Sequence, residues 1–318
     1  MPHSSITCQR KLRRVATPTW RSGGPTSSSS PAGPELAGPE PVNLWVEAAR
    51  PKTLVAAVAP VLVGTAAADR FLPWRFGLTL VVALALQVAV NYANDLSDAA
   101  RGVDALRHGP RRAVSSGLIS PGSMKLGIAC ALGVACAAGL VLVFQVGPEL
   151  VGLGGASIIA ALAYSGGPRP YASEGLGEVF VFVFFGLVAT AGSAYVQEEQ
   201  ITMVALAAAV PMGLLASAIL VVNNLRDIDS DAAAGKRTLA VRIGDRATRG
   251  LYRRLVLGAF ALLPVVAGAA QSIGPLVAFV TLHLGLRALR LGDDALAQTA
   301  RLELVFAILL AAGLGLST

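Results

Sequence analysis

The chain has 318 residues, of which 54% are hydrophobic and only 14% are charged, and its mean hydropathy is +0.63. Soluble domains carry roughly 25% charged residues, so this composition excludes a soluble globular protein and predicts an integral membrane protein in contact with the lipid bilayer. The net charge of +7 does not indicate a nucleic-acid partner, because the basic residues lie in short gaps between apolar runs and no base-reading motif is present.

The first part of the chain differs in composition from the rest. It is rich in Arg and Lys at first and then in Gly, Pro and Ser, as in the run 27–31. Such a segment cannot bury a core, so we expect a disordered tail over residues 1–41 and a transmembrane domain over residues 42–318. The tail lacks the apolar segment of a secretory signal peptide, and a cytosolic tail is favoured over an organelle transit peptide.

Nine apolar runs follow, most of them close to the roughly 20 residues that cross a bilayer as a helix. In chain order they span residues 44–68, 76–95, 122–145, 149–166, 178–197, 201–224, 250–270, 273–291 and 299–317. Gly and Pro occur in several runs, which bundled membrane helices tolerate because neighbouring helices satisfy the freed backbone groups. The sequence predicts an all-α, polytopic membrane helix bundle of about nine transmembrane helices.

The basic residues orient these spans. With nine spans drawn, all of the 26 Lys and Arg residues except Arg70 and Arg75 lie on one side, together with the N-terminus. Cytoplasmic loops carry the excess of Lys and Arg in membrane proteins. We therefore expect a multi-pass protein of the inner (plasma) membrane with its N-terminus and its charged loops in the cytoplasm.

Carboxylates gather at the cytoplasmic ends of the second and sixth runs. The two clusters read Asn91-Tyr-Ala-Asn94-Asp95-Leu-Ser-Asp98, with Asp104 further on, and Asn223-Asn224-Leu-Arg226-Asp227-Ile-Asp229-Ser-Asp231. Members spaced three, four or seven apart share one face of a helix. Each run thus ends in a polar face, and both faces lie on the same side of the membrane.

Such clusters are unfavourable by themselves. Two carboxylates about 4 Å apart repel by roughly 4 kcal/mol at an effective dielectric constant of about 20, and both helix C-termini and burial disfavour negative charge. Asp and Asn oxygens are ligands of Mg²⁺, which keeps open positions for phosphate oxygens. We therefore predict a Mg²⁺ cofactor and a bound diphosphate, whose departure as pyrophosphate the metal would stabilise. A solvated helix end is the simpler interpretation of one such cluster, but not of two.

Basic side chains adjoin both clusters and are suited to bind phosphate oxygens. Those predicted to contact the phosphates are Arg107, Arg111, Arg112, Lys236 and Arg237.

These motifs resemble the two aspartate motifs of the UbiA-type membrane prenyltransferases. Within that superfamily the chain is most similar to the 1,4-dihydroxy-2-naphthoate polyprenyltransferases of menaquinone synthesis. The resemblance covers about residues 43–317 and is carried by Asn94-x-x-x-Asp98, Asp227-x-x-x-Asp231 and the stretches Ala49–Leu54, Tyr164–Pro170, Gly175–Glu178 and Asn223–Gly244.

The resemblance implies a helix bundle around a central cavity with a lateral opening for a lipid chain. It also implies Mg²⁺-dependent transfer of a prenyl group from polyprenyl diphosphate to dihydroxynaphthoate, with loss of pyrophosphate and CO₂, to give demethylmenaquinone. On this hypothesis one Mg²⁺ is bound by Asn94 and Asp98, aided by Asp95 and Asp104, and another by Asp227 and Asp231, aided by Asn223.

Further roles follow from position. Tyr164, at the end of the fourth run, is a candidate to stabilise an allylic cation through its ring, although an interfacial anchor explains it equally well. Arg50, Lys52 and Arg169 are candidates to bind the carboxylate of the acceptor, or are basic anchors of helix ends.

Two alternatives remain at this point. The acceptor is open among 4-hydroxybenzoate, homogentisate and haem in place of dihydroxynaphthoate. An ion-coupled secondary transporter would also carry intramembrane carboxylates, but its sites usually lie near the middle of the bilayer on broken helices, whereas these acids cluster at one face.

Overall fold

The computed structural model describes residues 41–102 and 112–316, and for residues 41–43 only the backbone. Residues 1–40 of the predicted tail, and the predicted site residues Asp104, Arg107 and Arg111, lie outside these residues, whereas Pro41, the last residue of the predicted tail, begins a helix. The described part is helical and contains no strand, so the all-α membrane fold is confirmed.

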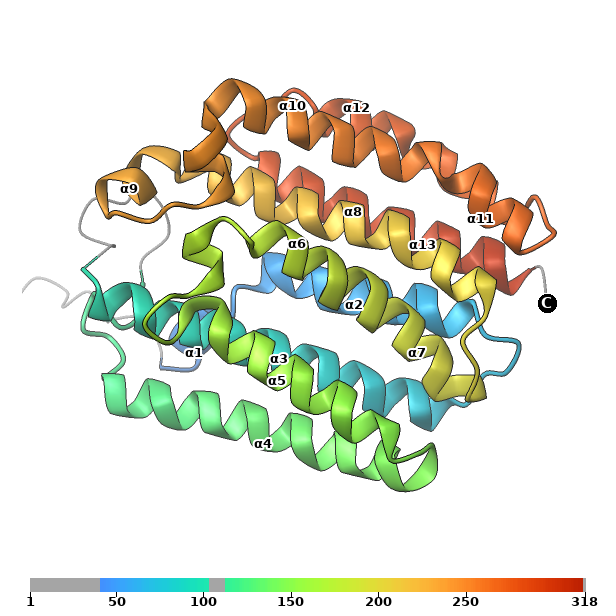
Figure 1. The fold of residues 1–318 in the computed structure, drawn as a ribbon, viewed down its shortest axis with the longest axis horizontal. Coiled ribbons are helices and arrows are strands. Elements are labelled where there is room, and N and C mark those ends of the chain that lie inside the picture. The colour runs from blue at the N-terminus through green and yellow to red at the C-terminus, as the bar shows by residue number, and fades with distance from the viewer. Residues whose placement is uncertain (1–40, 103–111, 317–318) are drawn as a thin grey trace, which may run out of the picture. The chain divides into compact units, whose positions relative to one another are not determined.

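Long helices lie side by side in the bundle, with α4 at one edge and α10 and α12 at the other (Figure 1). The first half of the chain forms α1 (Pro41–Ala49), α2 (Pro51–Ala66), α3 (Pro73–Ala100), α4 (Pro121–Gln145), α5 (Glu149–Ser165) and the short 3₁₀ helix η2 (Tyr171–Glu174). The second half forms α6 (Gly177–Val181), the π-helical segment η3 (Phe182–Val188), α7 (Ala189–Glu198), α8 (Met203–Arg226), α9 (Ile228–Ala233), α10 (Leu239–Ala261), α11 (Leu263–Ala269), the 3₁₀ helix η4 (Gly274–Thr281), α12 (Leu282–Ala288) and α13 (Ala295–Gly315).

Local signals set many helix starts. Proline opens α2, α3 and α4, where its missing N–H would have no helical partner in any case. The side chains of Ser120, Thr202 and Thr238 cap α4, α8 and α10 by accepting a hydrogen bond from a backbone N–H three residues on. The caps place the starts of α4 and α8 close to the starts of their predicted apolar runs, whereas α10 begins at Leu239, well before the run predicted from residue 250.

Six helical segments of the described residues are long and apolar enough to cross a membrane. They are residues 73–100, 121–145, 177–198, 203–226, 239–269 and 295–315, and three shorter apolar helices cover residues 51–66, 149–165 and 274–288. Together they correspond in order to the nine predicted runs, but nine crossings are not confirmed. The first run is shorter than predicted because the chain breaks at Arg50, whose left-handed backbone (φ 53°, ψ 72°) separates α1 from α2.

Helix α8 is the most buried of the six long segments. Its small residues permit close contact: a Cβ added to Gly186 of η3 would lie 2.4 Å from the Cα of Gly213 of α8. Large side chains such as Tyr252 and Phe306 complete the core around it. The outer helices instead expose apolar side chains such as Phe144, as a lipid-facing surface requires.

One arginine ties three helices together at the end of the bundle away from the acidic motifs. Arg75, at the start of α3, donates to the carbonyls of Val196 (2.8 Å) and Gln145 (3.1 Å) and to the Oε1 of Glu199 (2.9 Å). The carbonyls belong to the last turns of α7 and α4, which have no helical donor of their own. The guanidinium is buried, at 6% exposure of the residue, and therefore acts as a shared cap.

Replacing Arg75 with Met should lower the free energy of unfolding by about 2–4 kcal/mol, because buried carbonyls and a carboxylate would lose their donor. Thermal unfolding of the protein in detergent measures the effect. The same change at Arg70, which is exposed, is the matched control and should leave the transition unchanged. Equal transitions for the two variants would contradict a capping role.

Candidate active site

The predicted acidic motifs meet at one end of the bundle, called the acidic end below. Helix α3 carries Arg75 near its start and Asp98 near its end, about 35 Å apart at 1.5 Å per residue. A small polar pocket at the acidic end is lined by Asn94, Asp98, Arg101, Tyr164, Ser165, Ala172, Ser173, Gly177, Asn223, Asn224, Asp227, Asp231, Lys236 and Thr238. Both motifs thus contribute to one pocket.

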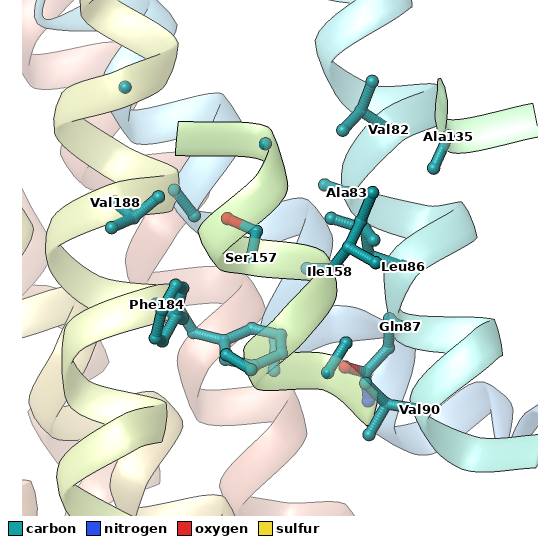
Figure 2. Close-up of a pocket in the computed structure, with 18 of the residues that line it drawn as sticks. Val82, Ala83, Leu86, Gln87, Val90, Ala135, Ser157, Ile158, Phe184 and Val188 are labelled. Atoms are coloured by element: carbon teal, nitrogen blue, oxygen red, sulfur yellow. The ribbon is translucent and has the colours of Figure 1, made fainter. Parts of the chain in front are cut away.

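The polar pocket adjoins a much larger cavity of about 540 Å³ inside the bundle. Asn94, Tyr164 and Asn223 line both spaces, and the rest of the cavity wall is mostly apolar. Figure 2 shows Val82, Leu86 and Val90 of α3 on one side of this cavity, with Phe184 and Val188 on another. The arrangement can hold a molecule with a charged head and a long apolar tail.

The first motif places Asp98 in the pocket, with 2% of the residue exposed. Its Oδ1 accepts from the Nζ of Lys236 (2.7 Å) and its Oδ2 from the guanidinium of Arg112 (3.4 Å). Asp95, a predicted metal ligand, does not line the pocket. Its carboxylate faces the segment after α3 and accepts from the backbone N–H of Val114 (3.3 Å).

The second motif crosses a helix junction. Helix α8 ends at Arg226 and α9 begins at Ile228, yet the N–H of Asp227 still donates to the carbonyl of Asn223 (3.2 Å), and that of Asp231 to the carbonyl of Asp227 (2.8 Å). The four-residue spacing therefore keeps these three side chains on one side, as predicted. Asp227 and Asp231 are both buried.

Arg226 holds the middle of this motif. Its Nε and one terminal nitrogen each donate to Asp227 at 2.9 Å, and the terminal nitrogen also lies 2.9 Å from the Oδ1 of Asn223. A bidentate guanidinium fixes the orientation of a carboxylate as well as neutralising it.

A single lysine joins the two motifs. The Nζ of Lys236 lies 2.7 Å from the Oδ1 of Asp98 and 3.7 Å from the Oδ1 of Asp231. These two carboxylates are far apart in the sequence, and their common contact brings them within reach of one ligand.

Arg50 is a site residue that the sequence interpretation undervalued. Its side chain lines the large cavity. When the side-chain amide of Asn94 is oriented with its oxygen toward Arg50, that oxygen accepts hydrogen bonds from both terminal nitrogens of Arg50 at 3.0 Å. A left-handed backbone is uncommon for a residue with a Cβ and often marks function. The Arg50-Pro51 pair offered a signal, because a residue before proline is disfavoured in the helical region.

Three predicted substrate-binding residues are not brought to either cavity. Lys52, Arg169 and Arg237 are exposed. Arg237 differs from its neighbour Lys236 because its backbone is bound to the η2 segment, its N–H donating to the carbonyl of Ser173 (3.0 Å), while its side chain faces outward.

An aromatic row runs from the polar pocket into the cavity. It begins at Tyr164, a predicted site residue, and continues with Tyr171, Phe180 and Phe184, which the sequence interpretation missed. The ring centroids are 5.5 Å apart for Tyr164 and Tyr171, 4.0 Å for Tyr171 and Phe180, and 6.1 Å for Phe180 and Phe184. All four rings line the cavity. Burial raises the pKa of the Tyr171 hydroxyl. This hydroxyl donates a hydrogen bond to the carbonyl of Ala160 (2.8 Å), which fixes the orientation of the Tyr171 ring.

The donor set fits a hard divalent cation that is shared with a phosphate. In the described residues no three His, Cys, Asp or Glu side chains form a metal-binding group by themselves. Carboxylate and amide oxygens from both motifs nevertheless line one pocket. Mg²⁺ typically takes one or two carboxylates and completes its shell with water and substrate phosphates, which is the kind of partial site these residues offer.

Comparison with known proteins agrees with this arrangement. The family model described as UbiA prenyltransferase family matches residues 57–314. The chain is 44% identical to the 1,4-dihydroxy-2-naphthoate octaprenyltransferase of Mycobacterium leprae, over 86% of this chain and 96% of the relative. It is 47% identical to the enzyme of the same name from Mycobacterium tuberculosis, over 67% and 74% of the two chains.

Solved structures share the fold. A UbiA homologue from Archaeoglobus fulgidus bound to GPP and Mg²⁺ aligns with a TM-score of 0.61 at 18% identity, over 85% of this chain and 98% of the homologue. A UbiA homologue from Aeropyrum pernix K1 aligns with a TM-score of 0.64 at 17% identity, over 82% and 96%. On the family match and the identity to its relatives, the chain belongs to the UbiA prenyltransferase family.

Proposed function

We propose that this membrane enzyme transfers a polyprenyl group from polyprenyl diphosphate to 1,4-dihydroxy-2-naphthoate, giving demethylmenaquinol, the hydroquinone form of demethylmenaquinone. The observation that carries the proposal is the high identity to enzymes named 1,4-dihydroxy-2-naphthoate octaprenyltransferase along nearly the whole length of one of them. The adjoining polar pocket and apolar cavity support it, because a prenyl diphosphate has the same two parts.

The diphosphate group of the prenyl donor would bind in the polar pocket. Asn94 and Asp98 on one side, and Asn223, Asp227 and Asp231 on the other, are the residues that would hold Mg²⁺ there, with Asp104 a further ligand proposed from the sequence. Bound Mg²⁺ would neutralise the charge that develops on the departing pyrophosphate. Support comes from the Archaeoglobus fulgidus homologue, which was solved with GPP and Mg²⁺.

Basic residues would hold the phosphate oxygens directly. Lys236 and Arg112 already contact the first motif and Arg226 the second, so each needs little movement to donate to a diphosphate. Arg107 and Arg111 remain proposed phosphate contacts on the grounds of sequence alone. The positive-inside pattern supports placing this end of the bundle on the cytoplasmic side of the inner membrane.

The apolar cavity would hold the prenyl chain and exclude water. When the allylic C–O bond breaks, its electron pair leaves with pyrophosphate, and the carbon that remains is electron-poor. The faces of Tyr164 and Tyr171 can stabilise this positive charge. The electron-rich acceptor ring then forms the new C–C bond at the carbon bearing the carboxylate, and CO₂ leaves as the electrons of its bond restore the aromatic ring.

Arg50 is the proposed contact for the carboxylate of the acceptor. Of the three basic residues suggested for this role, it is the one that lines the cavity, beside Asn94.

Incubating the purified protein with dihydroxynaphthoate and octaprenyl diphosphate, with and without Mg²⁺, tests the reaction. Mass analysis should detect the prenylated, decarboxylated hydroquinone, or the quinone that air oxidation forms from it, only with Mg²⁺. Prenylation of 4-hydroxybenzoate or homogentisate in its place would overturn the proposed acceptor, and transport of an ion without pyrophosphate release would overturn the enzyme class.

Changing Asp98 or Asp227 to Ala should lower turnover by at least about 10²–10³-fold, because the departing pyrophosphate would lose its main charge stabilisation. Steady-state kinetics on folded protein measures this. Asp229→Ala is the matched control, since Asp229 is exposed beside the same motif, and it should keep normal turnover. Near-normal activity of Asp98→Ala or Asp227→Ala would show that the metal assignment is wrong.

Arg50→Met should raise the KM for dihydroxynaphthoate by about tenfold or more, the effect of losing one charge-assisted hydrogen bond. The KM for the prenyl diphosphate should change less. Lys52→Met provides the contrast, because Lys52 is exposed, and its KM values should match the wild type. If Lys52→Met and Arg50→Met behave alike, the structural choice between them fails.

A further inference from the structure

Lys236 occupies a special position between the two acidic motifs. Its ammonium contacts Asp98 Oδ1 at 2.7 Å and Asp231 Oδ1 at 3.7 Å, and 13% of its side chain is exposed. Among the ion pairs found in the described residues, it alone joins both motifs, since Arg112 pairs with Asp98 and Arg226 with Asp227.

The oxygens that Lys236 contacts are the oxygens that a bridging divalent cation would use. Lys is a compact point charge with donors only, so it cannot become a metal ligand while it is charged. An ammonium and a divalent cation at neighbouring positions repel strongly in a partly buried site. Lysine and metal therefore compete for Asp98 and Asp231.

The backbone around Lys236 is fixed, which leaves the side chain as the part that moves. The N–H of Lys236 donates to the carbonyl of Asp231 (2.9 Å), and the N–H of Arg237 donates to the carbonyl of Ser173 (3.0 Å). Gly235 adopts a positive φ of 75° at the turn before it. The flexible four-carbon stem can swing the ammonium from the carboxylates to a nearby diphosphate without moving this turn.

We propose that Lys236 is an internal counter-ion that keeps the two motifs together until metal and diphosphate bind as a pair. A metal alone must displace the ammonium and leave it unpaired beside the metal. A metal with a diphosphate offers the ammonium new phosphate oxygens, so displacement costs little. The site thereby favours the metal complex of the prenyl diphosphate over the free metal ion. This inference rests on the proposed prenyl diphosphate chemistry and extends it to the order of binding.

The first half of the proposal is that Lys236 opposes the binding of metal alone. It is tested by measuring the affinity of the full-length protein in detergent for Mn²⁺ alone by electron paramagnetic resonance. Lys236→Met keeps most of the stem and removes the charge, and it should bind Mn²⁺ about tenfold or more tighter than the wild type. Lys236→Arg keeps the charge and should stay close to the wild type. Lys125→Met makes the same substitution at an exposed lysine on α4 and should not change the affinity.

Adding geranyl diphosphate tests the second half of the proposal, that the diphosphate makes displacement of the ammonium favourable, first in the wild type and then in Lys236→Met. In the wild type, Mn²⁺ affinity should rise at least tenfold when the diphosphate is present, and in Lys236→Met this gain should shrink severalfold. Unchanged or weaker binding of Mn²⁺ alone by Lys236→Met would overturn the proposal, as would a Lys125→Met variant that binds Mn²⁺ alone as tightly as Lys236→Met. A wild type whose Mn²⁺ affinity does not change when the diphosphate is added would also overturn it.

These experiments test the role of Lys236 independently of the proposed prenyl transfer reaction. The Mn²⁺ measurements use no aromatic acceptor, so a protein that prenylates a different acceptor still reports on Lys236. Conversely, a wild type that makes the expected quinone while Lys236→Met binds Mn²⁺ no more tightly would retain the function and lose only the counter-ion role.

Discussion

The structure depends on the need to neutralise carboxylates that are buried at one end of an apolar bundle. Asp98, Asp227 and Asp231 are each at most 6% exposed, and an uncompensated charge at such a site is strongly destabilising. Arg112, Arg226 and Lys236 meet this need with direct contacts. The same carboxylates and cations form the pocket that is proposed to bind a metal-bound diphosphate.

The rest of the bundle keeps that charged end in position. The first motif lies at the end of α3. The second motif begins at the end of α8, which packs tightly through Gly213. Helix α3 is itself held at its other end by the hydrogen bonds of Arg75 to the last turns of α4 and α7. The apolar cavity lies between these supports, so one rigid frame positions both the head and the tail of the proposed donor.

Much of this could be predicted from the sequence. The apolar runs, the one-sided basic loops and the two Asp motifs follow from periodicity and charge, which act locally along the chain. The meeting of Asp98 with Asp231 was an expectation that the described contacts support. The sequence offered Arg50 only as one of three candidates for the acceptor, because the choice among them depends on the backbone break at this residue. The places of Tyr171 and Phe180 in the aromatic row could not be foreseen, because they depend on tertiary packing. Lys236 and Arg237 are adjacent basic residues that the sequence predicts equally well as phosphate contacts. Only the tertiary structure shows that Lys236 lines the pocket and Arg237 is exposed.

The two spaces of the site share just Asn94, Tyr164 and Asn223 in their linings. Apart from these three residues and the proposed substrate contacts Arg50 and Tyr171 in the large cavity, the residues of the polar pocket and those of the apolar wall can therefore vary separately. Substitutions along η3, and along α5 before Tyr164, can reshape the apolar wall for a longer, shorter or more saturated chain while the proposed chemistry in the polar pocket stays intact. Such a division lets a single scaffold diversify its lipid preference by drift in residues that never touch a charge.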